Sequence, residues 1–437
     1  MKKYFIKTLG CKVNQYESES ISKEFSENDL IPVTGDTKAD VCVINTCTVT
    51  QKAAMQSRQA IRQAIRANPG ARIVVTGCYA ETELEQIKKI KGVHEVIGNT
   101  AKHRLLDIIK PDSCNDKYTR LPINKMFQFE HMPFVPTGSR TRPFLKIQDG
   151  CNSFCTYCIV PHARGPSRSL PLQKVLENIR YLKENGYREV VLTGIHLGCY
   201  GTDLSPEIDI FTLLKEVLEK KIIDRIRLSS LEPAELTEAI IQLTSESTGK
   251  PGNICHHFHI PLQSGDDTVL KKMGRLYSRE FFKNLVLNIH DHLPDAAIGV
   301  DTLIGFPGES EQAFENTYNL IHELPVAYLH VFPFSPRKGT PAYSFTEKIA
   351  TDIIKNRCKR MRELGRIKRQ SFYKKFIRKN LEILVESKRD RKTGLLKGLA
   401  SNYIPVLIPG NDNLKNSFVN VNIDKVDKNN NVYGTMM

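Results

Sequence analysis

The sequence contains no apolar run approaching the ~20 residues that a membrane-spanning helix needs. Its first ten residues hold no apolar core of the length found in secretory signals, so we expect a cytoplasmic protein with no membrane partner. Acidic residues are also scarce: 48 Asp and Glu face 63 Lys and Arg, which leaves a formal net charge of +15. This surplus favours a polyanionic partner, nucleic acid before an anionic membrane surface, over a basic protein with no such partner.

Most structural zinc sites combine two pairs of cysteine or histidine ligands. The sequence also lacks a second pair of this kind at a suitable spacing. The 11 cysteines are an odd number and their spacing suits disulfides poorly, so we expect a reducing compartment. Cys151, Cys155 and Cys158 follow Gly150 with the spacing C-x3-C-x2-C. Three thiolates can hold an iron–sulfur cubane and leave one iron open for a substrate. The spacing favours this interpretation over half of a zinc site or a disulfide loop.

Residues 1–112 alternate short apolar runs with amphipathic stretches, an order that predicts an open, doubly wound parallel sheet. The expected strands are 3–9, 40–46, 71–76 and 93–97. The helices expected after them are 17–28, 51–67, 81–90 and a last one that ends at residue 109. Cys11, Cys47 and Cys78 fall just past the ends of the first three strands. Loops beyond the carboxyl ends of parallel strands converge, so these thiols could meet as ligands of one cluster, although each alone is more typical of a small buried residue. Cys42, inside a strand, is predicted to lie in the core.

Residues 113–139 are rich in Pro, Asn, Asp and Met without periodicity, so we interpret them as a linker in which Cys114 has no role. Over residues 140–370 the strand–helix alternation resumes, with helices such as 172–184 and 311–323. The expected strands are 143–148, 189–193, 224–229, 256–262, 297–303 and 328–333. Six such units predict an open relative of the βα barrel, with its site at the carboxyl ends of the strands. His256, His257 and His259 share one strand without an acidic residue at metal-ligand spacing, so we assign them to packing or substrate contacts.

Residues 348–379 predict a helix in which cations greatly outnumber acidic residues, so few of the cations can be neutralised by ion pairs along the helix. Contacts with phosphates therefore explain this charge better than a solvated helix face does. Its cations include Lys355, Arg357, Lys359, Arg360, Arg362, Arg366, Lys368, Arg369, Lys374 and Lys375. Residues 371–437 then alternate apolar and polar positions between turn-formers, as at 381–386, 403–408 and 418–423. This pattern predicts a small all-β barrel, although Pro405 is unusual within a central strand.

The motif of Cys151, Cys155 and Cys158 after a first barrel strand resembles the signature of the radical S-adenosylmethionine (SAM) enzymes. Its continuation over residues 158–168 resembles the methylthiotransferases in particular. The resemblance implies a [4Fe–4S] cluster on these cysteines whose open iron chelates SAM and whose electron yields a 5′-deoxyadenosyl radical. It also implies a SAM cradle at the strand ends. The residues expected there are Tyr157, Thr193, Gly194, Glu232, Gln263, Gly299 and Gly305.

The segments 10–14, 45–50 and 76–81 resemble the amino-terminal domain of the same family. In that family Cys11, Cys47 and Cys78 would hold a second [4Fe–4S] cluster that carries the sulfur to be delivered. Residues 371–437 resemble the TRAM module, an OB-like RNA-binding barrel. The fold class expected is therefore α/β: an amino-terminal doubly wound parallel sheet, a central open (βα)6 radical SAM barrel and a carboxy-terminal OB-like barrel.

The segment 9–18 is most similar to the methylthiotransferases of N6-threonylcarbamoyladenosine. This implies transfer of a methylthio group to C2 of that nucleoside at position 37, in the anticodon loop of tRNA, with an electron donor such as a flavodoxin or ferredoxin. The carboxylate of the threonylcarbamoyl group calls for a nearby cation, for which Arg164, Arg168 and Arg275 are candidates. The expected RNA contacts are Arg164, Arg168, Arg275, Arg362, Arg366, Lys368 and Arg369. The alternatives are isopentenyladenosine in tRNA, an aspartate of a ribosomal protein, or a non-catalytic iron–sulfur RNA-binding protein.

Overall fold

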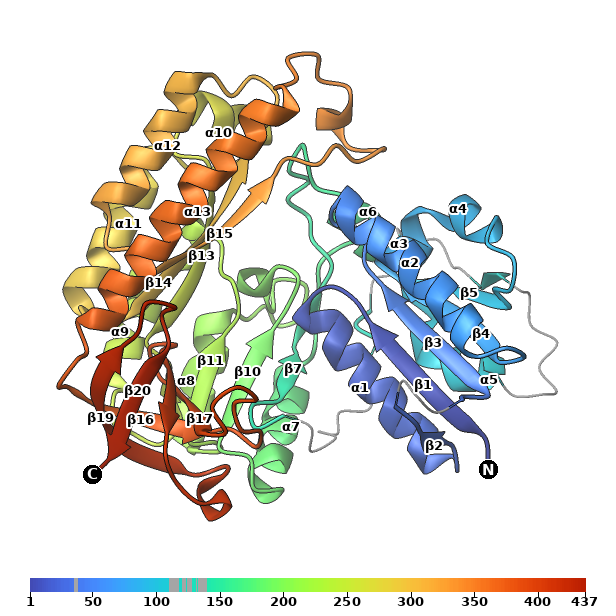
Figure 1. Cartoon of the computed structure of the whole chain (residues 1–437), viewed down its shortest axis with the longest axis horizontal. Helices are drawn as coiled ribbons and strands as arrows, with labels where there is room; N and C mark the ends of the chain where they lie inside the picture. The colour runs from blue at the N-terminus through green and yellow to red at the C-terminus, as the bar shows by residue number, and fades with distance from the viewer. Residues whose placement is uncertain (35–37, 110–117, 120–122, 124–127, 131, 133–139) are drawn as a thin grey trace.

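The structure is a computed structural model that describes residues 1–34, 38–109, 118–119, 123, 128–130, 132 and 140–437. It combines parallel sheets with covering helices and ends in a small closed barrel, which confirms the predicted fold class. Figure 1 shows the amino-terminal sheet on one side, the central strands on the other, and the carboxy-terminal barrel below the central strands. Cys114 lies outside the described residues.

The amino-terminal sheet is parallel throughout, with the strand order β2-β1-β3-β4-β5-β6. Its strands are β1 (Lys3–Thr8), β2 (Ile31–Pro32), β3 (Val41–Thr46), β4 (Arg72–Gly77), β5 (Glu95–Ile97) and β6 (Tyr118–Thr119). Its helices are α1 (Lys12–Glu27), α2 (Gln51–Ala67), α3 (Cys78–Thr82), α4 (Leu84–Lys88) and α5 (Leu105–Ile109). Cys42 is fully buried in β3, as predicted.

Two helices of this sheet differ from the prediction at their amino-terminal ends. Helix α1 begins at Lys12 and not at residue 17, because its buried face carries polar residues such as Asn14, Glu17 and Ser18 that hide the amphipathic pattern. The helix predicted over residues 81–90 is two short helices, and the first begins at Cys78 itself. In both places the helix starts directly at a candidate ligand.

The central region contains the six predicted strands and the short strand β12, which was not predicted, hydrogen-bonded as two parallel sheets in the orders β12-β11-β10-β7 and β13-β14-β15. These strands are β7 (Phe144–Lys146), β10 (Glu189–Thr193), β11 (Arg225–Leu228), β12 (Asn253–Ile254), β13 (His257–Gln263), β14 (Ala297–Ile304) and β15 (Tyr328–Pro333). The Leu231 amide donates to the His259 carbonyl at 3.0 Å and joins the two sheets beyond β11. The result is an open barrel.

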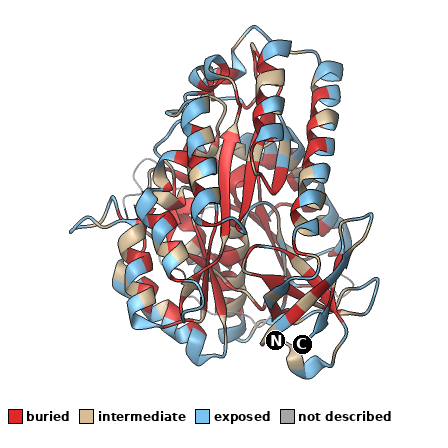
Figure 2. Ribbon diagram, turned by 90° about the vertical axis from the view of Figure 1, so that its left-hand side faces the viewer, coloured by how far each residue is buried: buried red, intermediate tan, exposed pale blue. Residues whose placement is uncertain are grey.

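Helices cover the outside of this barrel, and the strands between them are buried (Figure 2). The helices are α7 (Leu172–Glu184), α8 (Ile210–Lys220), α9 (Glu238–Glu246), α10 (Asp267–Met273), α11 (Arg279–His292) and α12 (Glu311–Glu323). Their apolar faces, for example Val175 and Ile179 of α7, pack into one continuous core with the strands. Within the described residues we find no helix whose length and apolarity suit a bilayer.

The basic helix α13 (Thr351–Lys374) leads into a closed antiparallel and parallel barrel of order β16-β17-β18-β20-β19. Its strands are β16 (Asn380–Val385), β17 (Leu396–Ala400), β18 (Pro405–Ile408), β19 (Phe418–Val426) and β20 (Val432–Met436). Pro405 is the first residue of β18, where a missing amide proton costs little. The short strands β17 and β20, each with a central Gly, were not predicted.

The turn between β17 and β18 enters the open side of the central barrel. Arg225 donates to the Leu399 carbonyl at 3.0 Å, and Arg227 donates to the Ser401 carbonyl at 3.0 Å. The ring of Tyr403 stacks on His257 at a centroid distance of 4.2 Å. Glu189 lies between the two arginines at 2.6 and 2.8 Å, so their charge is balanced inside the barrel.

Candidate active site

The three amino-terminal candidate cysteines meet at the carboxyl ends of their strands. Cys11 precedes helix α1, Cys47 follows β3, and Cys78 begins α3. They are close enough for negative charge on one to oppose ionisation of another: burial, followed by the charge of Cys78, raises the pKa of Cys47 to about 11. A buried thiol of this kind keeps its proton unless a metal displaces it. The donor set therefore fits a thiolate-bound cluster.

Glycines set the backbone just before the candidate ligands. Gly77 precedes Cys78 with a φ of +95°, and a Cβ there would lie 2.4 Å from the Thr46 carbonyl oxygen. Gly150 precedes Cys151 with a φ of +76°, and its Cβ would lie 1.9 Å from the Pro166 carbonyl oxygen. Only a residue without a Cβ fits such positions.

The second set of cysteines occupies the loop between β8 (Gln148–Asp149) and α6 (Val160–Arg164). Burial, and then the neighbouring Cys155 and Cys151, raise the pKa of Cys158 to about 12. A guanidinium nitrogen of Arg275 lies 3.4 Å from the Cys155 sulfur, and Nδ1 of His196 lies 3.4 Å from the Cys151 sulfur. Converging thiols with adjacent hydrogen-bond donors also suit an iron–sulfur cluster.

The two cysteine sets are joined by the packing of α3 against α6. Asn99 links them directly, because its amide nitrogen donates to the Ala163 carbonyl of α6 at 2.7 Å and lies 3.9 Å from the Cys78 sulfur. Its backbone amide donates to Glu81 of α3 at 2.9 Å. The two cysteine sets therefore lie beside adjoining helices, at the contact between the amino-terminal domain and the central barrel.

A buried network of charges lies beneath both sets. The guanidinium of Arg164 contacts Glu17 of α1 at 2.7 Å, Asp149 at 3.1 Å and the side-chain oxygen of Asn14 at 2.5 Å. Burial alone would raise the pKa of Glu17 and Asp149, but the surrounding cations outweigh it and hold both well below the usual range. The other cations in this network are Lys102, Lys146 and Arg168.

Two of the expected RNA and carboxylate contacts are wrong for this reason. Arg164 and Arg168 are 1% and 2% exposed and paired with carboxylates, so neither can reach a phosphate or a substrate. Arg275 forms an ion pair with Glu232 beside Cys155, and its expected contact with the substrate stays a prediction. The sequence signal that could have placed Arg164 is Asp149, which directly precedes Gly150, but the partner Glu17 comes from a helix of the other domain.

One of the residues expected around SAM, Glu232, lines a cavity beside Cys155. Glu232 and Arg275 border a cavity of about 120 Å3 together with Cys155 and Tyr277, whose hydroxyl donates to the Pro261 carbonyl at 2.9 Å. Tyr157 is half-buried and packs edge-on against Phe306, with ring centroids 6.4 Å apart.

The other SAM candidates occupy strand ends or lie away from them. Thr193 ends β10, Gly194 lies against the side chain of Gln148, and Gln263 ends β13 with a φ of +63°. Gly299 is near the amino end of β14, where the ring of Tyr328 fills the position of its missing Cβ, so its expected contact with SAM is wrong. Gly305 follows β14, but its missing Cβ makes room for Ile354 of α13.

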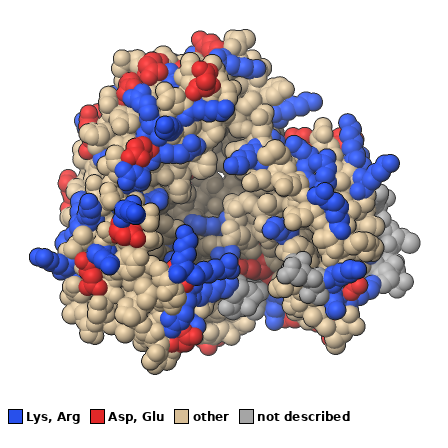
Figure 3. Space-filling view, in the orientation of Figure 1, with Lys and Arg blue, Asp and Glu red and all other residues tan. Residues whose placement is uncertain are grey.

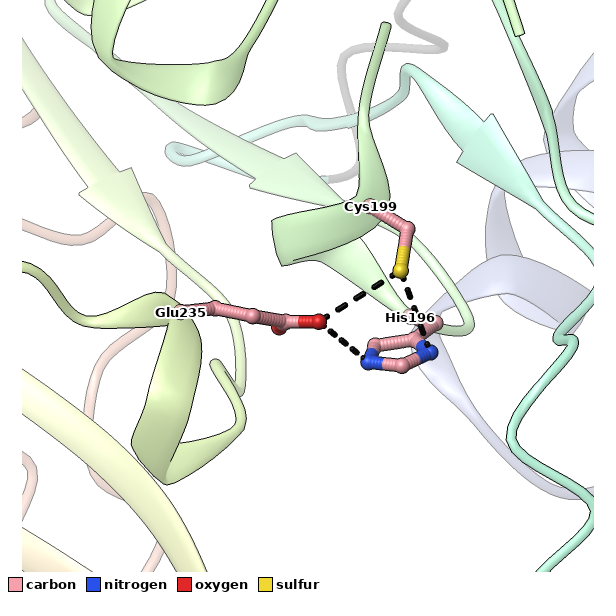
Figure 4. Close-up of side chains that lie close together, drawn as sticks. All are labelled: His196, Cys199 and Glu235. Atoms are coloured by element: carbon pink, nitrogen blue, oxygen red, sulfur yellow. Dashed lines mark hydrogen bonds and ion pairs between the residues drawn. The ribbon is translucent and has the colours of Figure 1, made fainter. Parts of the chain in front are cut away.

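His196, Cys199 and Glu235 form a compact group that the sequence did not reveal (Figure 4). Nε2 of His196 lies 2.5 Å from Glu235, and its Nδ1 lies 3.5 Å from the Cys199 sulfur. Burial would lower the pKa of His196, but these contacts and that with Cys151 raise it well above its ordinary value. Because His196 touches Cys151, the group belongs to the rim of the second cysteine set.

The histidines of β13 have partners on the next two strands. His259 contacts Asp301 of β14 at 2.8 Å, and His330 of β15 contacts the same oxygen at 3.2 Å. Tyr328 joins His257 at 2.7 Å and His259 at 3.0 Å. The argument that these histidines lack an acidic partner is therefore wrong, because spacing along one strand says nothing about neighbouring strands. They point into the barrel interior.

Only part of the basic helix α13 is free to contact a phosphate. Arg357 pairs with Glu309 at 2.7 Å, and Arg360 pairs with Glu315 at 2.7 Å, both on the neighbouring α12 side. Lys368 donates to the Leu324 carbonyl at 2.8 Å and so caps α12. Arg366 pairs with Glu363, whereas Arg362 is exposed and, among the residues described, donates only to the Val331 carbonyl. Figure 3 shows Lys and Arg gathered over this face of the molecule.

Comparisons with known proteins match both halves of this site. Residues 3–98 match the uncharacterized protein family UPF0004, and residues 145–321 match the radical SAM superfamily. The threonylcarbamoyladenosine tRNA methylthiotransferase MtaB of Bacillus subtilis is 39% identical over 430 residues, 96% of this chain and 93% of that protein. The protein of the same name from Aquifex aeolicus is 39% identical over 386 residues, 88% of this chain and 92% of that protein.

A second group of relatives carries another substrate in its name. The tRNA-2-methylthio-N(6)-dimethylallyladenosine synthase of Clostridium tetani is 32% identical over 97% of this chain and 94% of that protein.

Among solved structures, the radical SAM methyltransferase TsrM of Kitasatospora setae superimposes with a TM-score of 0.56 at 13% identity. The match covers 78% of this chain and 77% of that chain. At such low identity the likeness extends to the fold alone.

Proposed function

The chain belongs to the radical SAM tRNA methylthiotransferases, and on that premise we propose that it converts N6-threonylcarbamoyladenosine at position 37 of tRNA to its 2-methylthio derivative. The relatives named for this substrate are 35–39% identical, and those named for dimethylallyladenosine are 32% identical. Dimethylallyladenosine in tRNA is therefore the main alternative substrate.

The two cysteine sets are the observation that carries this proposal. The target is an unactivated C–H bond, which is not acidic enough for a general base to remove. Two [4Fe–4S] clusters and SAM would supply the radical chemistry and the sulfur, while the protein orients the reactants. Cys151, Cys155 and Cys158 would hold the cluster that binds SAM. The set that begins with Cys11 would hold the second cluster on the opposite wall of the same space.

The remaining parts suit a tRNA substrate. The carboxy-terminal barrel and the exposed cations of α13 offer contacts for the phosphates of a tRNA, and such contacts need no particular sequence. The reducing electrons would come from a small carrier such as a flavodoxin or ferredoxin. We expect the enzyme to act in the cytoplasm, where its substrate is found.

Mass spectrometry of tRNA nucleosides tests the proposal. Cells that lack the protein should lose the 2-methylthio form of threonylcarbamoyladenosine and keep that of isopentenyladenosine. Complementation with the wild type should restore the nucleoside, whereas Cys47→Ala should not. Loss of the isopentenyl derivative alone would assign the other tRNA substrate.

Two further outcomes would point away from tRNA methylthiolation. If neither nucleoside changes while a ribosomal-protein aspartate loses its methylthio group, the substrate is that protein. If the reconstituted, reduced protein yields no 5′-deoxyadenosine from SAM, a non-catalytic iron–sulfur RNA-binding role is favoured.

A further inference from the structure

A cationic pocket lies where the three parts of the chain meet. Its volume is about 390 Å3. Figure 3 shows Lys and Arg along the lower rim of the hollow at the centre of the molecule. Lys12 comes from the amino-terminal domain, Arg142 and Arg227 from the central barrel, and Lys388 and Tyr403 from the carboxy-terminal barrel. No one domain could build this pocket alone.

The pocket holds more positive charge than its own carboxylates balance. Arg142 pairs with Glu386 at 2.5 Å, and Arg227 pairs with Glu189 at 2.8 Å. Among the residues that the structure describes, no carboxylate lies within 4.0 Å of the ammonium of Lys12 or of Lys388. Cations that converge without counter-charges create a site for an anion.

The position of the pocket relates this anion to the reaction. Lys12 directly follows Cys11, and the barrel side chains Phe144, Val191 and Arg227 line the same wall. On β7, Lys146 projects on the same face as Phe144 and reaches Asp149 at 3.3 Å, just before the second cysteine set. The pocket is therefore lined by the residue that follows a candidate ligand of the first set and by the strand that leads towards the second set.

The chemistry of the nucleoside matches this arrangement. In adenine, N6 lies across N1 from C2, so a base whose C2 faces the clusters directs its N6 substituent away from them. The threonylcarbamoyl group ends in a carboxylate, whereas an isopentenyl group is neutral and apolar. Charge-assisted hydrogen bonds to a carboxylate are about twice as strong as neutral ones, while an apolar group would leave the cations unsatisfied.

We propose that this pocket receives the threonylcarbamoyl group and that Lys12 and Lys388 hold its carboxylate. The proposal rests on the function proposed above and gives the site its specificity for one tRNA nucleoside over the other. It also replaces Arg164, Arg168 and Arg275, which the sequence favoured for this role. Tyr403, which stacks on His257, would form the apolar side of the pocket.

The test uses two anticodon stem–loops, one with threonylcarbamoyladenosine and one in which its carboxylate is replaced by a carboxamide. For the reconstituted wild type we expect kcat/KM to be about ten- to hundredfold higher for the carboxylate, the difference typical of one charged hydrogen bond. Lys12→Met and Lys388→Met should each bring this ratio close to one, whereas Lys12→Arg should retain most of it. The ratio is an internal measure, so partial loss of folded or cluster-loaded enzyme cancels.

Lys359→Met is the matched control, since Lys359 is an exposed cation of α13 that does not line the pocket. This variant should change kcat/KM for both stem–loops by the same factor and leave their ratio unchanged. A wild-type ratio near one, or an unchanged ratio in Lys12→Met, would overturn this proposal while the proposed function stands. If the wild type modifies only loops with isopentenyladenosine, the proposed function fails and the proposal fails with it.

Discussion

Arg164 and Glu17 lie 2.7 Å apart, between Nη1 and Oε1, although 147 residues separate them in the sequence. Glu17 belongs to the helix that starts after Cys11, and Arg164 ends the helix that follows Cys158. Both side chains are buried, and Asp149 shares the same guanidinium. This ion pair therefore fixes the distance between the two cysteine sets, which a substrate placed between two clusters requires.

Glu17→Gln should destabilise the protein strongly. The change leaves Arg164, Lys102 and Lys146 with one carboxylate fewer in a buried site, and breaking a buried pair costs about 3–5 kcal/mol. We expect a matching fall in the free energy of unfolding in urea. Glu19→Gln is the control on the same helix, because its pair with Arg140 is partly exposed and should contribute less than about 1 kcal/mol. Equal losses in the two variants would contradict a structural role for the buried pair.

Iron analysis should separate the two cysteine sets. The wild type should bind about eight irons, four for each cubane. Cys47→Ala should retain about four irons and still cleave SAM to 5′-deoxyadenosine, without methylthiolation. Cys155→Ala should also retain about four irons but lose SAM cleavage. Cys42→Ala, which removes a core thiol of β3, should keep both clusters; a wild type with only about four irons would refute the second cluster.

Gly77→Ala should disrupt the cluster on the amino-terminal side. A Cβ at this position would meet the Thr46 carbonyl at 2.4 Å, so the strand end that carries Cys78 has to move. We expect the iron content to fall to about four in the variant, because one ligand is displaced. Gly70→Ala provides the control, since Gly70 also has a positive φ but no atom lies within 4 Å of its Cβ position. Loss of iron in both variants would attribute the effect to backbone strain and not to crowding.

Local pattern was enough to predict the fold of this chain. Strand–helix alternation, with buried runs such as Val41–Thr46, follows from side-chain periodicity, and it predicted the parallel sheet and the barrel. Because parallel strands end at a common edge, the positions of Cys11, Cys47 and Cys78 in the sequence also predicted that they would meet. These inferences need only the order of elements along the chain.

The partners of individual side chains could not be predicted in this way. Arg164 and Arg275 are of the residue type expected for RNA contacts, but carboxylates from distant segments neutralise them. The spacing of residues along the chain does not reveal such long-range pairs. Gly299 resembles a strand-end glycine, yet a ring from the neighbouring strand decides its role. Lys12 escaped notice because its importance depends on cations from two other domains.

The stability of the junction between the central and carboxy-terminal barrels should depend on pH through Glu189. Burial would raise its pKa, but Arg225 and Arg227 outweigh burial and lower it from 4.5 to about 2. A carboxyl group whose pKa is lowered by folding stabilises the folded state at pH values above its pKa in the unfolded chain. This contribution, about 3 kcal/mol here, is lost as the pH falls towards 2. In urea unfolding, the gap between wild type and Glu189→Gln should be constant from pH 8 to 6 and narrow by about 1 kcal/mol near pH 4. A gap that widens on acidification would contradict this assignment.

The unpaired cations of α13 should set the salt dependence of tRNA binding. Lys355, Lys359 and Arg362 follow one another at helical spacing and are exposed, and in the described part of the chain none has a carboxylate partner. Each phosphate contact releases counterions, so the triple change to Gln should weaken binding to every tRNA alike and reduce the slope of log K against log salt by about three. Changing Lys215 and Lys220 of α8 to Gln removes exposed cations from the outside of the barrel and should leave the slope unchanged. If the slope keeps its wild-type value in the triple variant, this helix does not contact the RNA backbone, and the phosphate contacts must come from the carboxy-terminal barrel or the pocket rim.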